Sequence, residues 1–280
     1  MLTSQENKEE TASRALEANQ QLLAYLRSLE SAAVAFSGGV DSAVVLKAGS
    51  LALGGRCVAA IAISPSLPAT EREGAVDLAR GFGVRVAEIE TRETEDPRYQ
   101  ANPPDRCYFC KDYVYGAIVD FARREGFGAV VDGMNADDRG DIRPGRRAAR
   151  EKGVLSPLAE LGIGKVMVRA MARAWDLPVW NKPAAACLSS RVPYGDPVTP
   201  EVLGQIERAE ASVRALGFEG FRVRHHGAVA RIEFPAADME LAFARRAEIS
   251  ERLRASGYTF VSLDLDGFRS GSLNENLRPK

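Results

Sequence analysis

The residues best suited to chemistry stand where a short apolar run ends and a helix is predicted to begin. The run at 32–36, AAVAF, has the pattern of a buried strand, SGGVDS follows it, and apolar residues at helical spacing continue to about residue 53. The glycines allow positive φ angles and close approach to an oxyanion, while the hydroxyls and the helix N-terminus supply hydrogen-bond donors. We therefore predict a pyrophosphate-binding loop made of Ser37, Gly38, Gly39, Val40, Asp41 and Ser42. A tight turn capped by Asp41 is the alternative.

This loop differs from a Walker-type P-loop, in which a lysine and a Ser or Thr directly follow the glycine-rich stretch. No lysine directly follows Gly38 and Gly39. The difference disfavours kinase-like transfer of a γ-phosphate.

Further polar residues are predicted at the same edge of a parallel sheet. Asn135, Asp137 and Asp138 stand at or just after the end of the predicted strand 129–135, and the carboxyl ends of parallel strands meet at one edge. Lys165 and Arg169 are one helical turn apart and could both reach a phosphate. The alternatives are a solvated Asp-rich loop and an exposed helix face.

The cysteines are too few to indicate a disulfide framework in a chain of 280 residues. Cys107 and Cys110 form a CxxC, which suits a redox pair, half of a zinc site or two iron–sulfur ligands. Cys187 stands in AAACLSS, a small-residue setting in which a lone cysteine is commonly a buried filler. We assign Cys57, in the predicted strand 57–64, to the core.

Two arginines near the C-terminal end predict an anion site. Arg222 and Arg224 alternate with apolar residues, so in a strand both guanidinium groups leave the same face. A solvated face of an edge strand is the alternative. His225 and His226 are adjacent and would point to opposite faces, so they are not interpreted as metal ligands.

The elements that must position these residues alternate along the chain. Predicted strands at 32–36, 57–64, 84–90 and 129–135 alternate with helices at 41–53, 70–83 and 111–127. This succession predicts an α/β fold, a parallel sheet with helices on both faces. Prolines and glycines cluster near residue 195 and mark a boundary. We expect a lead-in helix at 1–30, the α/β domain at 31–195 and a small α+β module at 196–280, with helices at 201–217 and 238–257 and strands at 221–227, 230–234 and 259–266.

Charge and hydropathy limit the classes of partner. The chain carries 37 Lys and Arg against 38 Asp and Glu, so no overall basic field attracts nucleic acid. The first 30 residues are too polar for a signal peptide, and no apolar run reaches the length of a membrane span. We expect a cytoplasmic protein without nucleic-acid or membrane partners.

The hexapeptide SGGVDS resembles the PP-loop signature of the ATP pyrophosphatase superfamily. Six further segments resemble the ATP-dependent sulfur transferases of nickel-pincer cofactor synthesis, the LarE family. They are NPPDRCYFCK at 102–111, DGMNADDRGDIRPG at 132–145, SPLAELGIGKVMVR at 156–169, WNKPAAACLSSRVPYG at 180–195, FRVRHHG at 221–227 and LDLDGFRSGSLNE at 263–275. The resemblance extends from about residue 31 to residue 276.

The resemblance implies a function. A pyridinium dicarboxylate mononucleotide is adenylated by ATP with Mg²⁺, and sulfur then displaces AMP to leave a thiocarboxylate. Asp41 would position the metal, and Arg222 and Arg224 would bind the substrate's phosphate. Homo-oligomers, a sulfur donor and a downstream nickel-inserting protein are the implied partners.

Two sources of sulfur follow from the same resemblance. Cys187 matches the sulfur-supplying cysteine of the family, which in one version gives up its own sulfur and becomes dehydroalanine. Other members hold a [4Fe-4S] cluster with three cysteines, whose open iron carries an extra sulfide. Cys107, Cys110 and Cys187 resemble that set, so we favour the cluster.

Three other functions remain open at this point. An amidating ligase of the NAD synthetase type would share the loop but has no use for the three cysteines. A tRNA thiolase should carry a basic surface, which the balanced charge disfavours. A non-catalytic nucleotide-binding or iron-sensing protein would release no pyrophosphate.

Overall fold

The computed structural model describes residues 4–140, 144–183 and 186–269, so the end of the predicted C-terminal module, residues 270–280, lies outside it. The chain divides into two compact units. The first contains Met1–Ser64, Ala69–Glu93 and Asp105–Ala185, and the second contains Pro65–Pro68, Thr94–Pro104 and Ala186–Lys280. Two short segments that follow strands or helices of the first unit therefore belong to the second.

The first unit is built on a parallel sheet, as the alternating pattern predicts. Its strands are β1 (Ala32–Ala35), β2 (Cys57–Ile63), β3 (Arg85–Glu90) and β4 (Ala129–Val131), in the order β3-β2-β1-β4. Ala32 of β1 pairs with Cys57 of β2 and with Ala129 of β4. β1, one of the two central strands, is apolar because helices cover both faces of the sheet.

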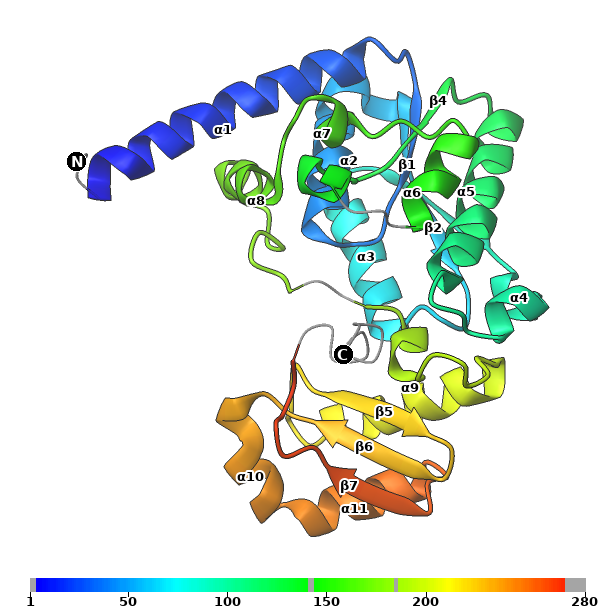
Figure 1. The fold of residues 1–280 in the computed structure, drawn as a ribbon. Helices are drawn as coiled ribbons and strands as arrows, with labels where there is room; N and C mark the ends of the chain where they lie inside the picture. Colours follow the sequence, from blue (N-terminus) through cyan, green and yellow to red (C-terminus); the bar gives the residue numbers. More distant parts are fainter. Residues whose placement is uncertain (1–3, 141–143, 184–185, 270–280) are drawn as a thin grey trace. The chain divides into compact units, whose positions relative to one another are not determined.

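Helices lie on both faces of this sheet (Figure 1). One face carries α2 (Val40–Leu53) and α3 (Ala69–Gly81), and the other carries α5 (Arg106–Glu125) and α6 (Pro144–Glu151). Buried Tyr115, Ile118 and Ala122 pack α5 onto the strands. The unit also contains α1 (Ser4–Arg27), the short α7 (Pro157–Glu160) and α8 (Lys165–Ala174). The predicted α/β class is confirmed. Within the described residues, no helix is both long and apolar enough to span a bilayer.

The second unit is a small α+β structure with its own core. Its three strands are β5 (Arg222–His226), β6 (Val229–Glu233) and β7 (Phe260–Leu263), in the order β5-β6-β7. β5 and β6 are antiparallel and β6 and β7 are parallel. Its helices are α4 (Pro97–Gln100), α9 (Pro200–Arg214), α10 (Met239–Ala244) and α11 (Arg246–Ala255). Phe218, Phe221 and Phe234 form the aromatic centre of the core.

One predicted helix is two helices in the structure. The single helix predicted at 238–257 is interrupted at Arg245, whose ψ of 17° leaves the α-helical range. The Arg245 guanidinium donates to the carbonyl oxygen of Leu216 at 2.7 Å, which fixes the interruption against the end of α9. The prediction of one continuous helix was therefore wrong, because a long-range hydrogen bond competes with local helix geometry.

Candidate active site

The loop between β1 and α2 is closed by its two serines. The backbone N–H of Ser37 donates to Ser42 Oγ at 3.3 Å, the two serine Oγ atoms lie 3.2 Å apart, and the Ser42 hydroxyl donates to the carbonyl oxygen of Gly39 at 3.1 Å. Gly38 has φ +71°, and a Cβ there would lie 2.9 Å from Ala75 Cβ on α3. Only glycine fits this position, because both the backbone angle and the close packing exclude a side chain.

Helix α2 begins within this loop, so the loop residues lie at its N-terminus. Gly39 is its N-cap residue, and in the described part of the chain no side chain caps it. The first N–H groups of a helix have no partner within the helix, and the helix dipole favours negative charge beside them. An uncapped N-terminus after a glycine-rich loop is therefore suited to bind a phosphate group.

The segment after β4 meets the loop closely. A Cβ on Gly133 would lie 2.5 Å from the backbone nitrogen of Ser42, so the two backbones touch at a point where only glycine fits. The Asn135 side-chain amide donates to Asp41 Oδ1 at 3.0 Å. The Lys165 ammonium group forms an ion pair with Asp41 Oδ2. Asp41, Asn135 and Lys165, which come from three separate segments, thus form one polar group beside the loop.

The two neighbouring aspartates hold backbone rather than extend this group. In η3 (Ala136–Gly140), the Asp137 carboxylate accepts a hydrogen bond from the Lys165 N–H at 2.7 Å. Asp138 accepts one from the Asn135 N–H at 3.2 Å. Arg169 is exposed on the next turn of α8, and no described residue forms an ion pair with it. The structure brings Lys165 to the loop but does not join Arg169 to the same group.

Asp41 is the residue that could hold Mg²⁺ at this loop. A carboxylate is the kind of oxygen ligand that Mg²⁺ prefers. Each Asp41 oxygen already has a partner, since Asn135 donates to one and Lys165 to the other. A metal ion at Asp41 would therefore compete with the Lys165 ammonium group.

A buried Tyr–Asp pair supports the same segment. The Tyr115 hydroxyl on α5 donates to Asp132 Oδ2 at 2.7 Å, and Asp132 Oδ1 accepts from the Met134 N–H at 3.1 Å. Burial, together with the negative charge of Asp132, raises the pKa of Tyr115 well above its ordinary value. The tyrosine thus stays a protonated donor, and it fixes the start of the segment that carries Asn135.

The four cysteines differ in exposure. Cys57 is buried in β2, and burial raises the pKa of its thiol to about 12, so its assignment to the core is confirmed. Cys107 is exposed and Cys110 partly buried in the first turns of α5, which begins at Arg106, five residues before the helix predicted at 111–127. Cys187, in the second unit, is partly buried and directly precedes the turn η4 (Leu188–Arg191). Three thiols are thus accessible, although no group of three His, Cys, Asp or Glu side chains placed to hold a metal ion is found among the described residues.

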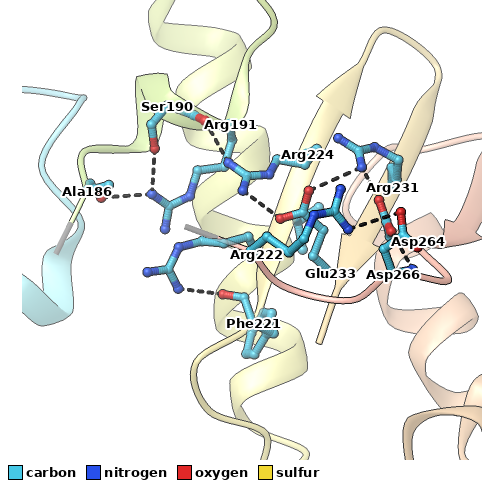
Figure 2. A network of polar contacts seen from close by, with 12 residues as sticks. Ala186, Ser190, Arg191, Phe221, Arg222, Arg224, Arg231, Glu233, Asp264 and Asp266 are labelled. Carbon is cyan, nitrogen blue, oxygen red and sulfur yellow. Dashed lines mark hydrogen bonds and ion pairs between the residues drawn. The ribbon is translucent and has the colours of Figure 1, made fainter. Parts of the chain in front are cut away.

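The backbone of Cys187 is fixed by a buried arginine. Arg191 donates to the carbonyl oxygen of Ala186 at 2.8 Å (Figure 2) and to that of Cys187 at 3.0 Å. The Ser190 hydroxyl also donates to the Cys187 carbonyl oxygen at 2.8 Å. Arg191 itself is held by Glu210 through two bonds of 2.9 and 3.0 Å. This arrangement holds the cysteine in place without using its sulfur.

Figure 2 shows that the two predicted arginines of β5, Arg222 and Arg224, have different polar partners. Arg224 is buried, donating to the carbonyl oxygen of Ser190 at 2.9 Å and to Glu233 at 2.5 Å. Arg222 donates to the carbonyl oxygen of Phe221 at 2.7 Å, and its guanidinium carbon lies 5.0 Å from the Phe268 ring centroid. No described residue forms an ion pair with Arg222. Burial, and then the positive charge of Arg191, lower the pKa of Arg222. Of the two, Arg222 has the charge that an incoming anion could neutralise.

In each unit, sequence reasoning missed residues that hold the predicted site residues in place. Lys182 contacts Glu71 and the loop carbonyl of Gly38, and Arg191 and Tyr115 fix the backbone near Cys187 and Asn135. Lys182 and Arg191 do lie within the segment 180–195, in which the sequence pattern predicts a role only for Cys187. The two histidines differ in exposure, as expected for neighbours that point to opposite faces of a strand. His225 is buried, with its Nδ1 atom 3.2 Å from the Tyr258 hydroxyl, and His226 is exposed.

A parallel sheet with the SGGVDS loop at the end of β1, one of its two central strands, defines an α/β protein with a PP-loop-like fold. No protein-family model matches the chain. The chain is 38% identical to the pyridinium-3,5-bisthiocarboxylic acid mononucleotide synthase of Lactiplantibacillus plantarum, over 91% of this chain and 93% of that protein. It is 42% identical to an uncharacterised protein of Synechocystis over 92% of this chain and 97% of that protein. It is 30% identical to an uncharacterised protein of Methanocaldococcus jannaschii over 60% of this chain and 66% of that protein. The chain belongs to the LarE family of pyridinium-3,5-bisthiocarboxylic acid mononucleotide synthase.

Proposed function

We propose that this chain is an ATP-dependent sulfur transferase that converts the carboxylates of a pyridinium-3,5-dicarboxylate mononucleotide into thiocarboxylates for a nickel-pincer cofactor. The name of the Lactiplantibacillus plantarum relative supports the product class. The observation that carries the proposal is the uncapped N-terminus of α2 beside the Asp41, Asn135 and Lys165 group. This arrangement combines backbone hydrogen-bond donors, which can bind an anion, with charged side chains at the edge of the sheet where a nucleotide would bind.

The first step makes a poor electrophile reactive. A carboxylate oxygen of the substrate attacks the α-phosphorus of ATP, the bond to the pyrophosphate oxygen breaks, and an acyl-adenylate forms. The N–H groups at the start of α2 and the Ser37 and Ser42 hydroxyls would stabilise the charge that develops on the departing pyrophosphate. Mg²⁺, when bound at Asp41, would supply further charge neutralisation.

The second unit would bind the substrate's phosphate. Arg222 is the proposed ligand, because its charge has no carboxylate partner among the described residues. Arg224 would act on this site indirectly, because its ion pair with Glu233 neutralises it and its bond to Ser190 links β5 to η4. This assigns different roles to two residues that the sequence pattern treats as equivalent.

For the sulfur source, we favour a [4Fe-4S] cluster held by Cys107, Cys110 and Cys187. The donor chemistry fits, because these three thiols are accessible and the fourth is buried. When bound, the cluster would supply the sulfur nucleophile that displaces AMP. In the alternative, the Cys187 thiolate attacks the acyl carbon and AMP leaves. Loss of the Cα proton with cleavage of the Cβ–S bond then yields thiocarboxylate and dehydroalanine.

The test is a product assay without oxygen. The protein is incubated with ATP, Mg²⁺ and the dicarboxylate mononucleotide, and AMP, pyrophosphate and the substrate mass are measured. We expect AMP and pyrophosphate in equal amounts and a gain of sulfur in the substrate. Asp41→Asn should reduce pyrophosphate release by about a hundredfold, because it removes the carboxylate that would hold Mg²⁺ beside the departing pyrophosphate. Asp120→Asn, which alters an exposed carboxylate paired with Arg123 on α5, is the matched control.

The same assay separates the other functions. Pyrophosphate release that needs ammonia and gives an amide would indicate an amidating ligase, and release that needs tRNA would indicate a tRNA thiolase. ATP binding without pyrophosphate release would indicate a non-catalytic protein. Formation of ADP and phosphate would contradict the proposal outright.

A further inference from the structure

A second lysine lies at the opposite end of the loop from Lys165. The Lys182 ammonium group is 2.7 Å from Glu71 Oε2 and 3.5 Å from the carbonyl oxygen of Gly38. Lys182, Glu71 and Gly38 all belong to the first unit. The Lys182 and Glu71 side chains are about one quarter exposed, at 27% and 25%, so both can be reached by a ligand.

We propose that Lys182 binds the pyrophosphate portion of ATP and that Glu71 holds it in place until the nucleotide arrives. The inference rests on the proposed function, since it assigns a further residue to the same nucleotide loop. It adds a residue that lies 144 positions along the chain from Gly38 of the loop. Lys182 would thus supply the ammonium group that a Walker-type P-loop carries within its own sequence.

The charges around the loop favour the movement of the Lys182 ammonium group from Glu71 to the phosphates of ATP. The loop is flanked by two lysine–carboxylate pairs, Lys165 with Asp41 and Lys182 with Glu71. Without nucleotide each ammonium group is neutralised, so the loop carries no excess positive charge. The triphosphate of ATP carries several negative charges and presents many acceptor oxygens, whereas Glu71 presents a single carboxylate. The ammonium group, a compact charge on a flexible stem, can turn from one partner to the other.

The position of Glu71 lowers the free-energy cost of breaking its ion pair with Lys182. Glu71 lies in the first turn of α3, where the helix dipole stabilises negative charge. Its carboxylate is partly exposed and can be hydrated after Lys182 turns away. The α3 helix also contacts the loop directly, through Ala75 against Gly38. The carboxylate that holds Lys182 is therefore fixed beside the phosphate site rather than far from it.

The test measures binding of ATP, inorganic pyrophosphate and AMP by titration calorimetry on the full chain. Lys182→Met should weaken binding of ATP and of pyrophosphate by about tenfold or more, the loss expected for one charged hydrogen bond, and should leave AMP binding nearly unchanged. Lys182→Arg should restore most of the lost affinity. Glu71→Gln should keep or raise the affinity for ATP by a few fold, because it removes the competing carboxylate.

Lys152→Met is the matched control. Lys152 is also paired with a carboxylate, Asp112 at 2.9 Å, at a similar exposure in the first unit, but its partner lies on α5. ATP binding should be unaffected by this substitution. A circular dichroism melt of each variant separates loss of binding from loss of the fold. If Lys182→Met does not fold, the affinity of Glu71→Gln for ATP decides whether Glu71 competes with ATP for Lys182 or supports the structure of the loop.

The outcomes distinguish this inference from the function it rests on. If the unmodified chain binds neither ATP nor pyrophosphate, the proposed function fails and the role of Lys182 fails with it. If the unmodified chain binds ATP and Lys182→Met binds it equally well, the inference alone is overturned. A loss of ATP binding in Glu71→Gln as large as in Lys182→Met would also overturn it, because the pair would then be a structural support.

Discussion

At the scale of residues, the cysteines differ in ways that allow a direct test of the sulfur source. The carbonyl oxygen of Cys187, a partly buried residue, is held by Arg191 and Ser190, while its sulfur takes no part in those bonds. We expect protein purified without oxygen to contain about four irons and about four acid-labile sulfides per chain, or about five sulfides where the open iron carries the extra one. Cys187→Ala should lose most of both. Measurement of iron and sulfide per chain checks this.

Cys57→Ala is the control for that measurement. It removes a thiol that is buried in β2, so the iron content should stay that of the unmodified chain. Absence of iron in the unmodified chain, even after reconstitution, would contradict the cluster. In that case, turnover should remove the mass of H₂S from the chain at Cys187, as expected for a sacrificial cysteine.

The polar residues that end or follow predicted strands were the easiest to find from sequence. Asp41 and Asn135 follow separate strands, and the parallel sheet places them 3.0 Å apart, as the carboxyl-edge argument anticipates. Lys182 gave no such signal, because nothing local indicates that this segment returns to Gly38. Arg224 shows the opposite limit. Its carboxylate partner Glu233 lies on β6, and only the pairing of two strands reveals that the arginine is neutralised.

At the scale of elements, α1 carries an unusual buried residue. Asn19 is 3% exposed, and within the described residues neither its amide nitrogen nor its amide oxygen has a hydrogen-bond partner. It stands next to buried Ala18 on the helix face that includes Leu22. A buried polar group without a partner costs about 1–3 kcal/mol, so its removal should stabilise the protein.

We therefore expect Asn19→Leu to stabilise the chain by about 1 kcal/mol, which raises Tm by about 2–4 °C in a domain of this size. A thermal melt followed by circular dichroism measures the change. Gln20→Leu places the same side chain on the exposed face of the same helix and should leave Tm nearly unchanged. A lower Tm in Asn19→Leu would mean that the amide has a partner, such as a bound water molecule.

Local pattern predicts elements well where burial determines them and poorly where one distant contact does. The four strands of the parallel sheet coincide with short apolar runs that the sequence displays openly. The sequence pattern missed the start of α5 at Arg106, so Cys107 and Cys110 lie on a helix rather than in the loop expected before residue 111. The break between α10 and α11 at Arg245 depends on a hydrogen bond to Leu216, 29 residues away, so local helix propensity does not predict it.

At the scale of the whole molecule, two units with separate cores divide the proposed work. The nucleotide loop belongs to the first unit, and Arg222 with Cys187 to the second. Composition and periodicity predicted both cores. They could not assign residues 65–68 and 94–104 to the second unit, because that assignment depends on contacts between segments far apart in the chain. Tyr99, for example, is buried with its hydroxyl 2.5 Å from Ser189 Oγ.

This division predicts that damage to one core leaves the other unit's ligand binding intact. Phe234 is fully buried, with its ring centroid 4.8 Å from that of Phe218 and 5.7 Å from that of Phe221. Phe234→Ala should destabilise the second unit by about 3–5 kcal/mol, the usual cost of such a truncation. Calorimetry should then show an earlier transition, while ATP affinity measured below that transition stays unchanged. Phe243→Ala, which truncates a ring that is 60% exposed on α10, should alter neither quantity. Loss of ATP binding in Phe234→Ala alone would mean that the first unit needs the folded second unit to keep its loop in place.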